Sequence, residues 1–413
     1  MDAELSRPIR GGSTEISPRH VLERARVLLR DPAVREAQRY LSDDDERVLS
    51  QQVQLSEIPA PPFGEAARAR RMAELFREAG LDHVELDDEG NVLGWLGRRR
   101  GDPLILSAHL DTVFPEGTDV RVTRTGTVLK GPGIGDDARG LAVLIAVAKA
   151  LSSPSLRLAG TVTFAATVGE EGLGDIRGAR HLVNTELAGT IDAFVSVDGV
   201  GLDVTNVGVG SRRYKVSFAG PGGHSYGAFG TANPIHALGR AVAAVSDLTV
   251  PSSPRTTFNV GRIGGGTSVN AIPFEAWFEV DLRSADAAAL TALDTRFRAL
   301  IDHAVAAENA RWNKPGQVSA TLTVAGDRPA GATAETAAIV RAARSATTAI
   351  GERLHLREGS TDANAAMYKG IPAITIDAGG SGSGAHALDE RFDSTDSWKG
   401  TVRAFLLAVL LAG

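Results

Sequence analysis

The spacing of hydrophobic positions changes several times along the chain and divides its first half into alternating strands and helices. Short apolar runs bounded by turn residues are typical of buried strands, whereas apolar positions three or four residues apart are typical of helices. We therefore expect strands at 84–95 (around a turn at 89–91), 104–108, 161–167 and 193–197, and helices at 65–80 and 138–151. Strands that alternate with helices predict an α/β domain with a mostly parallel mixed sheet.

The pattern changes after Gly210 and predicts a second, smaller domain. Strand-like alternation at 212–218 is followed by a helix at 233–248, two strands on either side of Asn270, a helix at 287–306 and a strand at 318–324. This β-α-β-β-α-β order is the ferredoxin-like arrangement. The α/β pattern then resumes with a helix at 334–349 and a strand at 373–376. The smaller domain is therefore predicted to be inserted into the larger one.

These patterns divide the chain into four segments. Residues 1–45 are polar, end in an acidic run and suit an exposed N-terminal extension with an amphipathic helix. Residues 46–210 and 326–413 are predicted to form the two pieces of the α/β domain, and residues 211–325 the inserted domain. A chain of 413 residues exceeds the size at which one hydrophobic core usually keeps growing, which agrees with two domains.

Composition excludes several classes of function. The chain has 44 Lys and Arg against 50 Asp and Glu and a net charge of −6, so neither a nucleic acid nor an anionic membrane is expected as a partner. The absence of cysteine excludes disulfides, thiolate metal ligands and a cysteine nucleophile. No signal-peptide-like run begins the sequence, and the most apolar segments, at 141–151 and 404–412, are too short to span a bilayer. We expect a cytoplasmic protein that acts on a small molecule.

Polar side chains follow the predicted strands at the ends where open α/β sheets bind ligands. His109 and Asp111 follow the strand at 104–108 and are two residues apart, so they share a face of the extended chain. A metal-bound histidine commonly donates its other ring N–H to a carboxylate, and Asp111 is well placed for that role. For this motif alone, a histidine satisfied by hydrogen bonds in the core is an equal alternative.

Two further motifs contain adjacent carboxylates. A glycine-rich turn leads to Asp136 and Asp137 at the start of the next predicted helix. An aspartate in that place is usually a helix N-cap, but two adjacent like charges are costly without a nearby cation. Glu170 and Glu171 follow the next buried strand. An exposed acidic turn is the alternative there, although the long apolar strand before it favours a functional pair.

Asp198 and His386 complete a set of groups that suits metal ions. Asp198 follows the strand at 193–197, and His386 follows a glycine-rich loop at 379–384. Together the order His, Asp, Glu-Glu, Asp, His supplies two imidazoles and three carboxylates, which suits a pair of zinc ions. One glutamate of the pair can bind metal, and Glu170 is then left over as the natural general base.

With these residues in view, the chain resembles the co-catalytic zinc metallopeptidase family (clan MH) of glutamate carboxypeptidase, acetylornithine deacetylase, succinyl-diaminopimelate desuccinylase, aminoacylase and tripeptidase. The resemblance runs from about Gln51 to the C-terminus. It implies a zinc-exopeptidase-like α/β catalytic domain with an inserted ferredoxin-like lid or dimerisation domain. It also implies two Zn²⁺ per subunit, replaceable by Co²⁺ or Mn²⁺. Asp136 would bridge the ions, His109 and Asp198 would complete one site, and Glu171 and His386 the other.

The same resemblance implies roles for residues that do not bind metal. Glu170 would act as the general base, and Asp111 would orient His109. The bond between Asp136 and Asp137 would be a cis peptide bond.

The inserted domain would supply contacts to the substrate and to a second subunit. His224, in the segment 220–225, would reach the active site of the neighbouring subunit in a homodimer and stabilise the oxyanion. Asn270 and Arg283 would hold the substrate, and their alternatives are a turn cap and a strand-edge charge. Thr361 would also contact the substrate, in a turn where Ser360 replaces the usual second glycine of a Gly-Gly-Thr-Asp motif.

The expected reaction is hydrolysis of an amide bond in a small peptide or an acylated amino acid. A metallo-exopeptidase is favoured because the Glu-Glu-Gly and Ser-Thr-Asp turns resemble the peptidase branch. A carboxypeptidase and an N-acyl-amino-acid deacylase of the aminoacylase or acetylornithine-deacetylase type are alternatives, since all use the same metal centre. The inserted domain disfavours a single-domain zinc aminopeptidase, and the complete set of ligands and base disfavours an inactive metal-binding scaffold.

Overall fold

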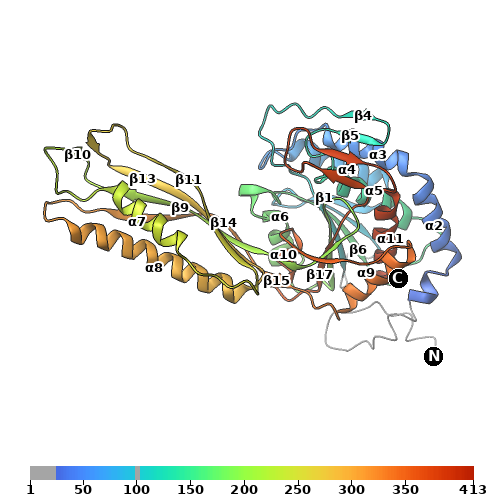
Figure 1. The fold of residues 1–413 in the computed structure, drawn as a ribbon. Coiled ribbons are helices and arrows are strands. Elements are labelled where there is room, and N and C mark those ends of the chain that lie inside the picture. Colours follow the sequence, from blue (N-terminus) through green and yellow to red (C-terminus); the bar gives the residue numbers. More distant parts are fainter. Residues whose placement is uncertain (1–24, 98–102) are drawn as a thin grey trace. The chain divides into compact units, whose positions relative to one another are not determined.

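The computed structural model describes residues 25–97 and 103–413, which belong to two compact units (Figure 1). Unit 1 combines the described residues up to Gly208 with Ala332–Gly413, and unit 2 is Val209–Gly331. The segment 211–325, expected from the sequence to be inserted, falls within unit 2. Residues 1–24 of the expected N-terminal extension lie outside the described residues.

Unit 1 is built on a mixed sheet with a parallel centre. β6 (Val162–Thr167), β3 (Leu104–His109), β7 (Ala193–Val197) and β17 (Ala373–Ile376) are neighbours in this order. Each adjacent pair among these four strands is parallel. Their carboxyl ends therefore lie at the same edge of the sheet.

The flanks of the same sheet contain antiparallel pairs. β2 (Val92–Leu96) is antiparallel to β6, and β1 (Asp82–Leu86) is antiparallel to β2. On the other side, β8 (Val204–Gly208) is antiparallel to β17 and has β16 (Leu356–Gly359) as a parallel neighbour. The predicted α/β fold with a mostly parallel mixed sheet is confirmed.

Successive side chains of a strand point to opposite faces of a sheet, and the central strands here are apolar at both sets of positions. Helices therefore cover both faces of this sheet. In β3, Leu104, Leu106 and Ala108 join one core with α5 (Ala138–Leu151), whereas Ile105 joins the opposite core. The first core also includes α4 (Ala66–Glu78), α9 (Ala338–Ala349) and α11 (Trp398–Ala412), and the second includes α6 (Arg177–His181) and α10 (Ala363–Tyr368). No helix in the described parts of the chain is long and apolar enough to cross a membrane.

The described part of the expected N-terminal extension packs as part of unit 1. α2 (Pro32–Asp43) begins after Asp31, whose carboxylate accepts a backbone N–H of the first turn at 2.8 Å. Val34, Ala37 and Leu41 of this helix lie in the same core as α5. The amphipathic pattern of the segment thus reflects burial against the α/β domain.

A small antiparallel sheet in unit 1 was not predicted. Its strands are three residues long and pair in the order β18 (Ser381–Ser383), β19 (Arg391–Asp393), β5 (Val128–Lys130) and β4 (Thr123–Thr125). His386 lies between β18 and β19, and Asp136 follows β5. The pairing of β19 with β5 therefore brings together two segments that are far apart in the sequence.

Unit 2 has the ferredoxin-like element order expected from the sequence: β9 (Gly210–Ala219), α7 (Pro234–Ser246), β11 (Thr256–Gly265), β13 (Glu275–Ser284), α8 (Ala287–Arg311) and β14 (Ser319–Arg328). Four of its strands form one antiparallel sheet in the order β11-β13-β9-β14. Tyr214, Val216 and Phe218 alternate along β9 and point into a core shared with both helices, which lie along one face of the sheet (Figure 1).

Candidate metal centre

The five predicted metal ligands lie on segments at or beyond the ends of unit 1 elements. His109 is the last residue of β3, Asp198 directly follows β7, and Glu171 lies in the turn after β6. Asp136 ends the glycine-rich loop before α5, and His386 lies between β18 and β19. Because β3, β6 and β7 are parallel, three of these residues are at the same edge of the sheet.

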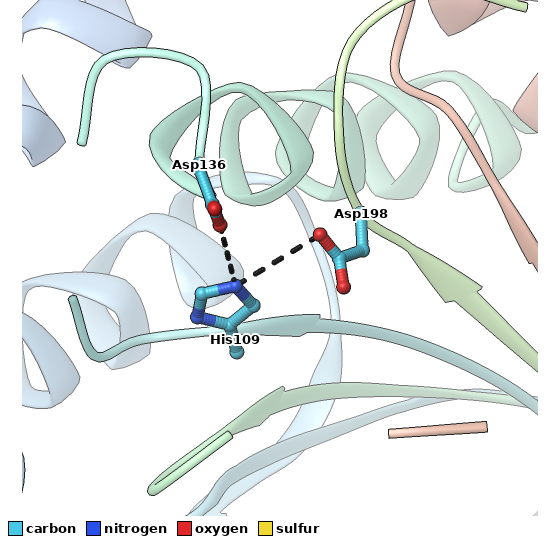
Figure 2. A group of neighbouring side chains, drawn as sticks. All are labelled: His109, Asp136 and Asp198. Atoms are coloured by element: carbon cyan, nitrogen blue, oxygen red, sulfur yellow. Dashed lines mark hydrogen bonds and ion pairs between the residues drawn. The ribbon is translucent and has the colours of Figure 1, made fainter. Parts of the chain in front are cut away.

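His109, Asp136 and Asp198 form a first group (Figure 2). His109 Nε2 lies 3.0 Å from Asp136 Oδ1 and 4.0 Å from Asp198 Oδ1. The three side chains come from a strand end, the loop before α5 and the loop after β7, and they point toward one another. Their ligand atoms lie within 4.8 Å of one another, which is close enough to hold a metal ion.

Asp136 also belongs to a second group, with Glu171 and His386. His386 Nε2 lies 3.2 Å from Asp136 Oδ2 and 2.9 Å from Glu171 Oε1. Asp136 therefore turns one carboxylate oxygen toward each histidine. Glu170 forms a further group with His109 and Glu171, so the expected base lies beside both sets of ligands.

The charge balance of these groups fits divalent cations. Burial, together with the charges of Asp136 and Glu171, raises the pKa of Asp198 to about 7 against the opposing effect of His109. Hydrogen bonds to Asp136 and Glu171 raise the pKa of His386 to about 10. Burial lowers the pKa of His109, but its carboxylate neighbours hold it well above the usual value. The site favours positive charge, and its nitrogen and oxygen donors are those that zinc accepts.

A family model described as peptidase family M20/M25/M40 matches residues 105–410, a range that contains all five ligands. The chain belongs to peptidase family M20/M25/M40. The resemblance to co-catalytic metallopeptidases and the predicted hydrolysis of amide bonds are thereby confirmed.

Relatives of this M20 protein cover much of its length. The uncharacterised protein YqjE of Bacillus subtilis (strain 168) is 26% identical over 356 residues, which are 81% of this chain and 91% of YqjE. Succinyl-diaminopimelate desuccinylase of Xanthomonas oryzae pv. oryzae (strain PXO99A) is 29% identical over 57% of this chain and 67% of its own. Aminopeptidase PepT of Bacillus cereus (ATCC 10987), at 21% identity and a TM-score of 0.71 over 89% of this chain and 98% of its own, has the same fold.

In this M20 protein, Asp111 contacts both the first histidine and the glutamate turn. His109 Nδ1 lies 2.9 Å from the carbonyl oxygen of Asp111 but 3.7 Å from its carboxylate. The carboxylate instead accepts the backbone N–H groups of Glu170 at 2.9 Å and Glu171 at 2.8 Å. The nearest acceptor for His109 Nδ1 is thus the Asp111 carbonyl, with the carboxylate within ion-pair distance, and the orientation of His109 by the Asp111 carboxylate stays a prediction. An Nδ1–H donated to this carbonyl leaves Nε2 facing the other ligands.

The helix-cap interpretation applies to Asp137 and not to Asp136. Asp137 Oδ1 accepts the N–H of Gly140 in the first turn of α5 at 3.0 Å, and Oδ2 accepts the N–H of His109 at 3.0 Å. The bond between Asp136 and Asp137 is cis, as the resemblance implied. Burial raises the pKa of Asp137 well above its usual value. Asp137 thus connects the start of α5 to the end of β3.

Glu390 was missed by the sequence analysis. Its buried carboxylate accepts the backbone N–H groups of Gly133 at 3.0 Å, Gly135 at 2.8 Å and Asp136 at 3.0 Å. Burial, and then the charge of Asp136, raise the pKa of Glu390 to about 7 against the effect of these donors. The only signal in the sequence is an acidic residue shortly after His386.

The expected substrate contacts are divided between the two units. In unit 1, the Thr361 hydroxyl lies 2.6 Å from the hydroxyl of Thr375. In unit 2, β10 (Gly223–His224) pairs with β12 (Ala271–Ile272), and the Ser225 N–H donates to the Asn270 carbonyl at 2.9 Å. His224 and Asn270 are therefore close neighbours.

Arg283 does not join that pair within unit 2. It lies near the end of β13, opposite Ser211 of β9, and its Nε donates to Asp281 Oδ2 at 2.7 Å. The segments of His224 and Asn270 adjoin the other end of this strand, because the Gly220 N–H donates to the Phe274 carbonyl at 3.0 Å. At the usual rise per residue these ends are roughly 25 Å apart.

Proposed function

We propose that the chain is a dinuclear metal-dependent exopeptidase that hydrolyses an amide bond of a small peptide, with two Zn²⁺ per subunit that Co²⁺ or Mn²⁺ can replace. The observation that supports this most is the shared carboxylate of Asp136, whose oxygens lie 3.0 Å from His109 and 3.2 Å from His386. Asp136 would bridge the ions, with His109 and Asp198 on one and Glu171 and His386 on the other. Histidine nitrogen and carboxylate oxygen are normal ligands for such pairs.

Glu170 would move the protons of the reaction. The bound ions would supply Lewis acidity, which polarises the scissile carbonyl and lowers the pKa of water. Glu170 is 4% exposed, and it would accept a proton from the attacking water as the water oxygen bonds to the carbonyl carbon. It would then donate that proton to the amine nitrogen as the C–N bond breaks. The Asp111 carboxylate would keep Glu170 in place by accepting the backbone N–H of Glu170.

His224 is suited to stabilise the oxyanion of this reaction. Its Nδ1 accepts the backbone N–H groups of Tyr226 and Gly227, each at 3.3 Å, so the proton of a neutral ring is on Nε2 and can be donated outward. We assign this donation to the active site of the partner subunit in a homodimer formed through unit 2. Asn270, Arg283 and Thr361 would bind the substrate.

A shared active site can be tested by mixing two inactive variants. His224→Ala and Glu170→Ala subunits should each lack activity, whereas their heterodimer contains one site with both residues intact. Restored peptide hydrolysis on mixing supports the shared site. Heterodimers detected by native mass spectrometry but without activity would rule it out.

An N-acyl-amino-acid deacylase is the second candidate. It is favoured by the similarity to succinyl-diaminopimelate desuccinylase of Xanthomonas oryzae, at 29% identity over 57% of the chain. The same two groups of ligands serve both reactions, because each breaks an amide bond next to a carbonyl that the ions can polarise.

A substrate panel separates the candidates. The protein is loaded with Zn²⁺, Co²⁺ or Mn²⁺ and given dipeptides and tripeptides with free or blocked termini, alongside N-acetyl and N-succinyl amino acids. Release of amino acids from peptides supports the exopeptidase. Hydrolysis of peptides with a blocked C-terminus then indicates an aminopeptidase, and hydrolysis of peptides with a blocked N-terminus indicates a carboxypeptidase. Release of acetate or succinate supports the deacylase. No hydrolysis by protein that binds two ions contradicts both.

A further inference from the structure

Glu390 connects the loop that carries Asp136 with the loop that carries His386. Its carboxylate accepts three backbone N–H groups of the loop 131–136, at 2.8 to 3.0 Å. Its carbonyl accepts a fourth, from Gly131, at 3.0 Å. Hydrogen bonds from backbone N–H groups to a carboxylate are stronger than those between neutral groups. One residue therefore fixes both the shared ligand and the chain that leaves His386.

The glycines of the loop 131–136 allow three of its backbone N–H groups to point at the Glu390 carboxylate. The backbone of Gly133 has a φ of 69°, a value that residues with a side chain rarely adopt. A Cβ at Gly135 would lie 2.9 Å from both Glu390 Oε1 and Val200 Cγ1. The glycine-rich sequence thus lets several N–H groups surround one carboxylate.

Glu390 connects the segments of two ligands of the group with Glu171, namely Asp136 and His386, but of only one ligand of the group with Asp198, namely Asp136. Asp136 Oδ2 faces His386 Nε2 at 3.2 Å, and both residues belong to segments that Glu390 connects. His109 is held separately, by the Asp137 carboxylate at its N–H and the Asp111 carbonyl at its ring. Loss of the Glu390 carboxylate should therefore loosen the group of Asp136, Glu171 and His386 more than the group that includes Asp198.

We propose that Glu390 is a positioning residue that fixes Asp136 relative to His386 and thereby sets the affinity of the second metal site. The inference rests on the dinuclear function proposed above. Glu390 acts only through the backbone of its neighbours.

The experiment is a titration of the metal-free full chain with Zn²⁺ in a calorimeter. Native mass spectrometry counts the ions that are bound. In Glu390→Gln, one carboxylate oxygen becomes an NH₂ group that faces a backbone N–H donor. The expected result is a first ion bound as in the wild type and a second bound about 10- to 100-fold more weakly, the usual effect of losing a group that orients a ligand.

A matched control separates this effect from general destabilisation. Glu308 in unit 2 is also a buried glutamate, and it accepts the Asn233 N–H at 3.1 Å and Trp312 Nε1–H at 2.7 Å. Glu308→Gln should leave both Zn²⁺ affinities of the protein unchanged. Circular dichroism and thermal melting of the metal-free variants show which of them fold.

A second variant tests the same connection without removing a charge. Gly135→Ala places a methyl group against the Glu390 carboxylate and should also weaken the second ion selectively. If Glu390→Gln does not fold, this variant decides the question.

The possible outcomes separate this inference from the proposed function. A wild-type chain that binds fewer than two ions overturns the dinuclear function and this inference with it. A wild-type chain that binds two ions, with folded Glu390→Gln and Gly135→Ala variants that bind them equally well, overturns the role of Glu390 alone. Equal weakening of both ions would also contradict a selective effect on the second site.

Discussion

The carboxylate of Asp111 accepts the backbone N–H of Glu171 at 2.8 Å and joins the end of β3 to the turn after β6. Its other oxygen accepts the N–H of Glu170 at 2.9 Å. β3 and β6 are parallel neighbours with His109 opposite Thr167, so the carboxylate spans two adjacent strand ends. The proposed base and a proposed metal ligand thereby share one anchor.

Asp111→Asn should lower both turnover and metal affinity. The amide keeps one acceptor but directs an NH₂ group at a backbone N–H, which releases one side of the glutamate turn. Groups that orient metal ligands typically contribute 10- to 100-fold, and we expect a loss of about that size in kcat/KM. Steady-state kinetics on a hydrolysed peptide and a Zn²⁺ titration measure the two effects.

Asp31→Asn is the control for this substitution. Asp31 also accepts two backbone N–H groups, of Ala33 at 2.8 Å and Val34 at 3.4 Å, but at the start of α2. Its replacement should leave kinetics and metal content unchanged. Wild-type kinetics in Asp111→Asn would show that the glutamate turn does not need this anchor.

Glu170→Ala should abolish most turnover and keep both metal ions. Loss of a positioned general base typically costs about 10²- to 10⁴-fold in rate. Because Glu170 also forms a close group with His109 and Glu171, the ion count decides whether it is a base or a ligand. Normal activity would exclude the role of base, and the loss of an ion would make Glu170 a ligand.

Asp136→Ala and His386→Ala should differ in the number of ions that each loses. Asp136 turns one oxygen toward His109 and the other toward His386, so its removal should weaken the binding of both ions. His386 belongs to only one of the two groups, so its removal should leave one ion bound. Metal analysis of both variants after dialysis gives the counts, and equal losses would contradict a shared Asp136.

Much of the fold follows from the sequence because its main elements are long enough to show a period. The segments 138–151 and 193–197 form α5 and β7 with the expected bounds. α11 (Trp398–Ala412) was not predicted as a helix, because its longest part, residues 404–412, is apolar throughout and shows no helical period. The strands β18 and β19 are three residues long, which is too short for alternation to be visible.

The candidate ligands were visible in the sequence because each follows an apolar strand or a glycine-rich loop. The contacts that position them were not, since they join distant parts of the chain. Glu390 reaches Gly133 only because β19 pairs with β5. Asp111 was expected beside His109 from local spacing, but its carboxylate extends to Glu171 across the β3–β6 pair. Such contacts depend on strand order, which local patterns do not specify.

Glu308 should make the stability of unit 2 depend on pH. Its carboxylate is buried in the structure and accepts hydrogen bonds from the Asn233 N–H, Arg240 and Trp312, and His236 Nδ1 lies 3.5 Å away. Although burial raises the pKa of Glu308, the hydrogen bonds from Trp312, Asn233 and Arg240 lower it below its usual value of 4.5. A lowered pKa in the folded state means that the ionised carboxylate of Glu308 stabilises the fold. This contribution to stability is complete above pH 4.5 and is lost as the pH falls through the lower pKa of the folded state.

Glu308→Gln should accordingly destabilise the protein at pH 7 and much less in acid. At neutral pH we expect a loss of about 1–3 kcal/mol in the free energy of unfolding, the usual effect of losing hydrogen bonds to a buried charged group. Below the folded-state pKa the wild-type carboxyl is also uncharged, so the two proteins should converge. Urea unfolding followed by circular dichroism at pH 7 and at a series of lower pH values measures how the difference changes. Glu275→Gln, at an exposed position of β13, should show no such change, and a penalty that stays constant as the pH falls would contradict the ionic role of Glu308.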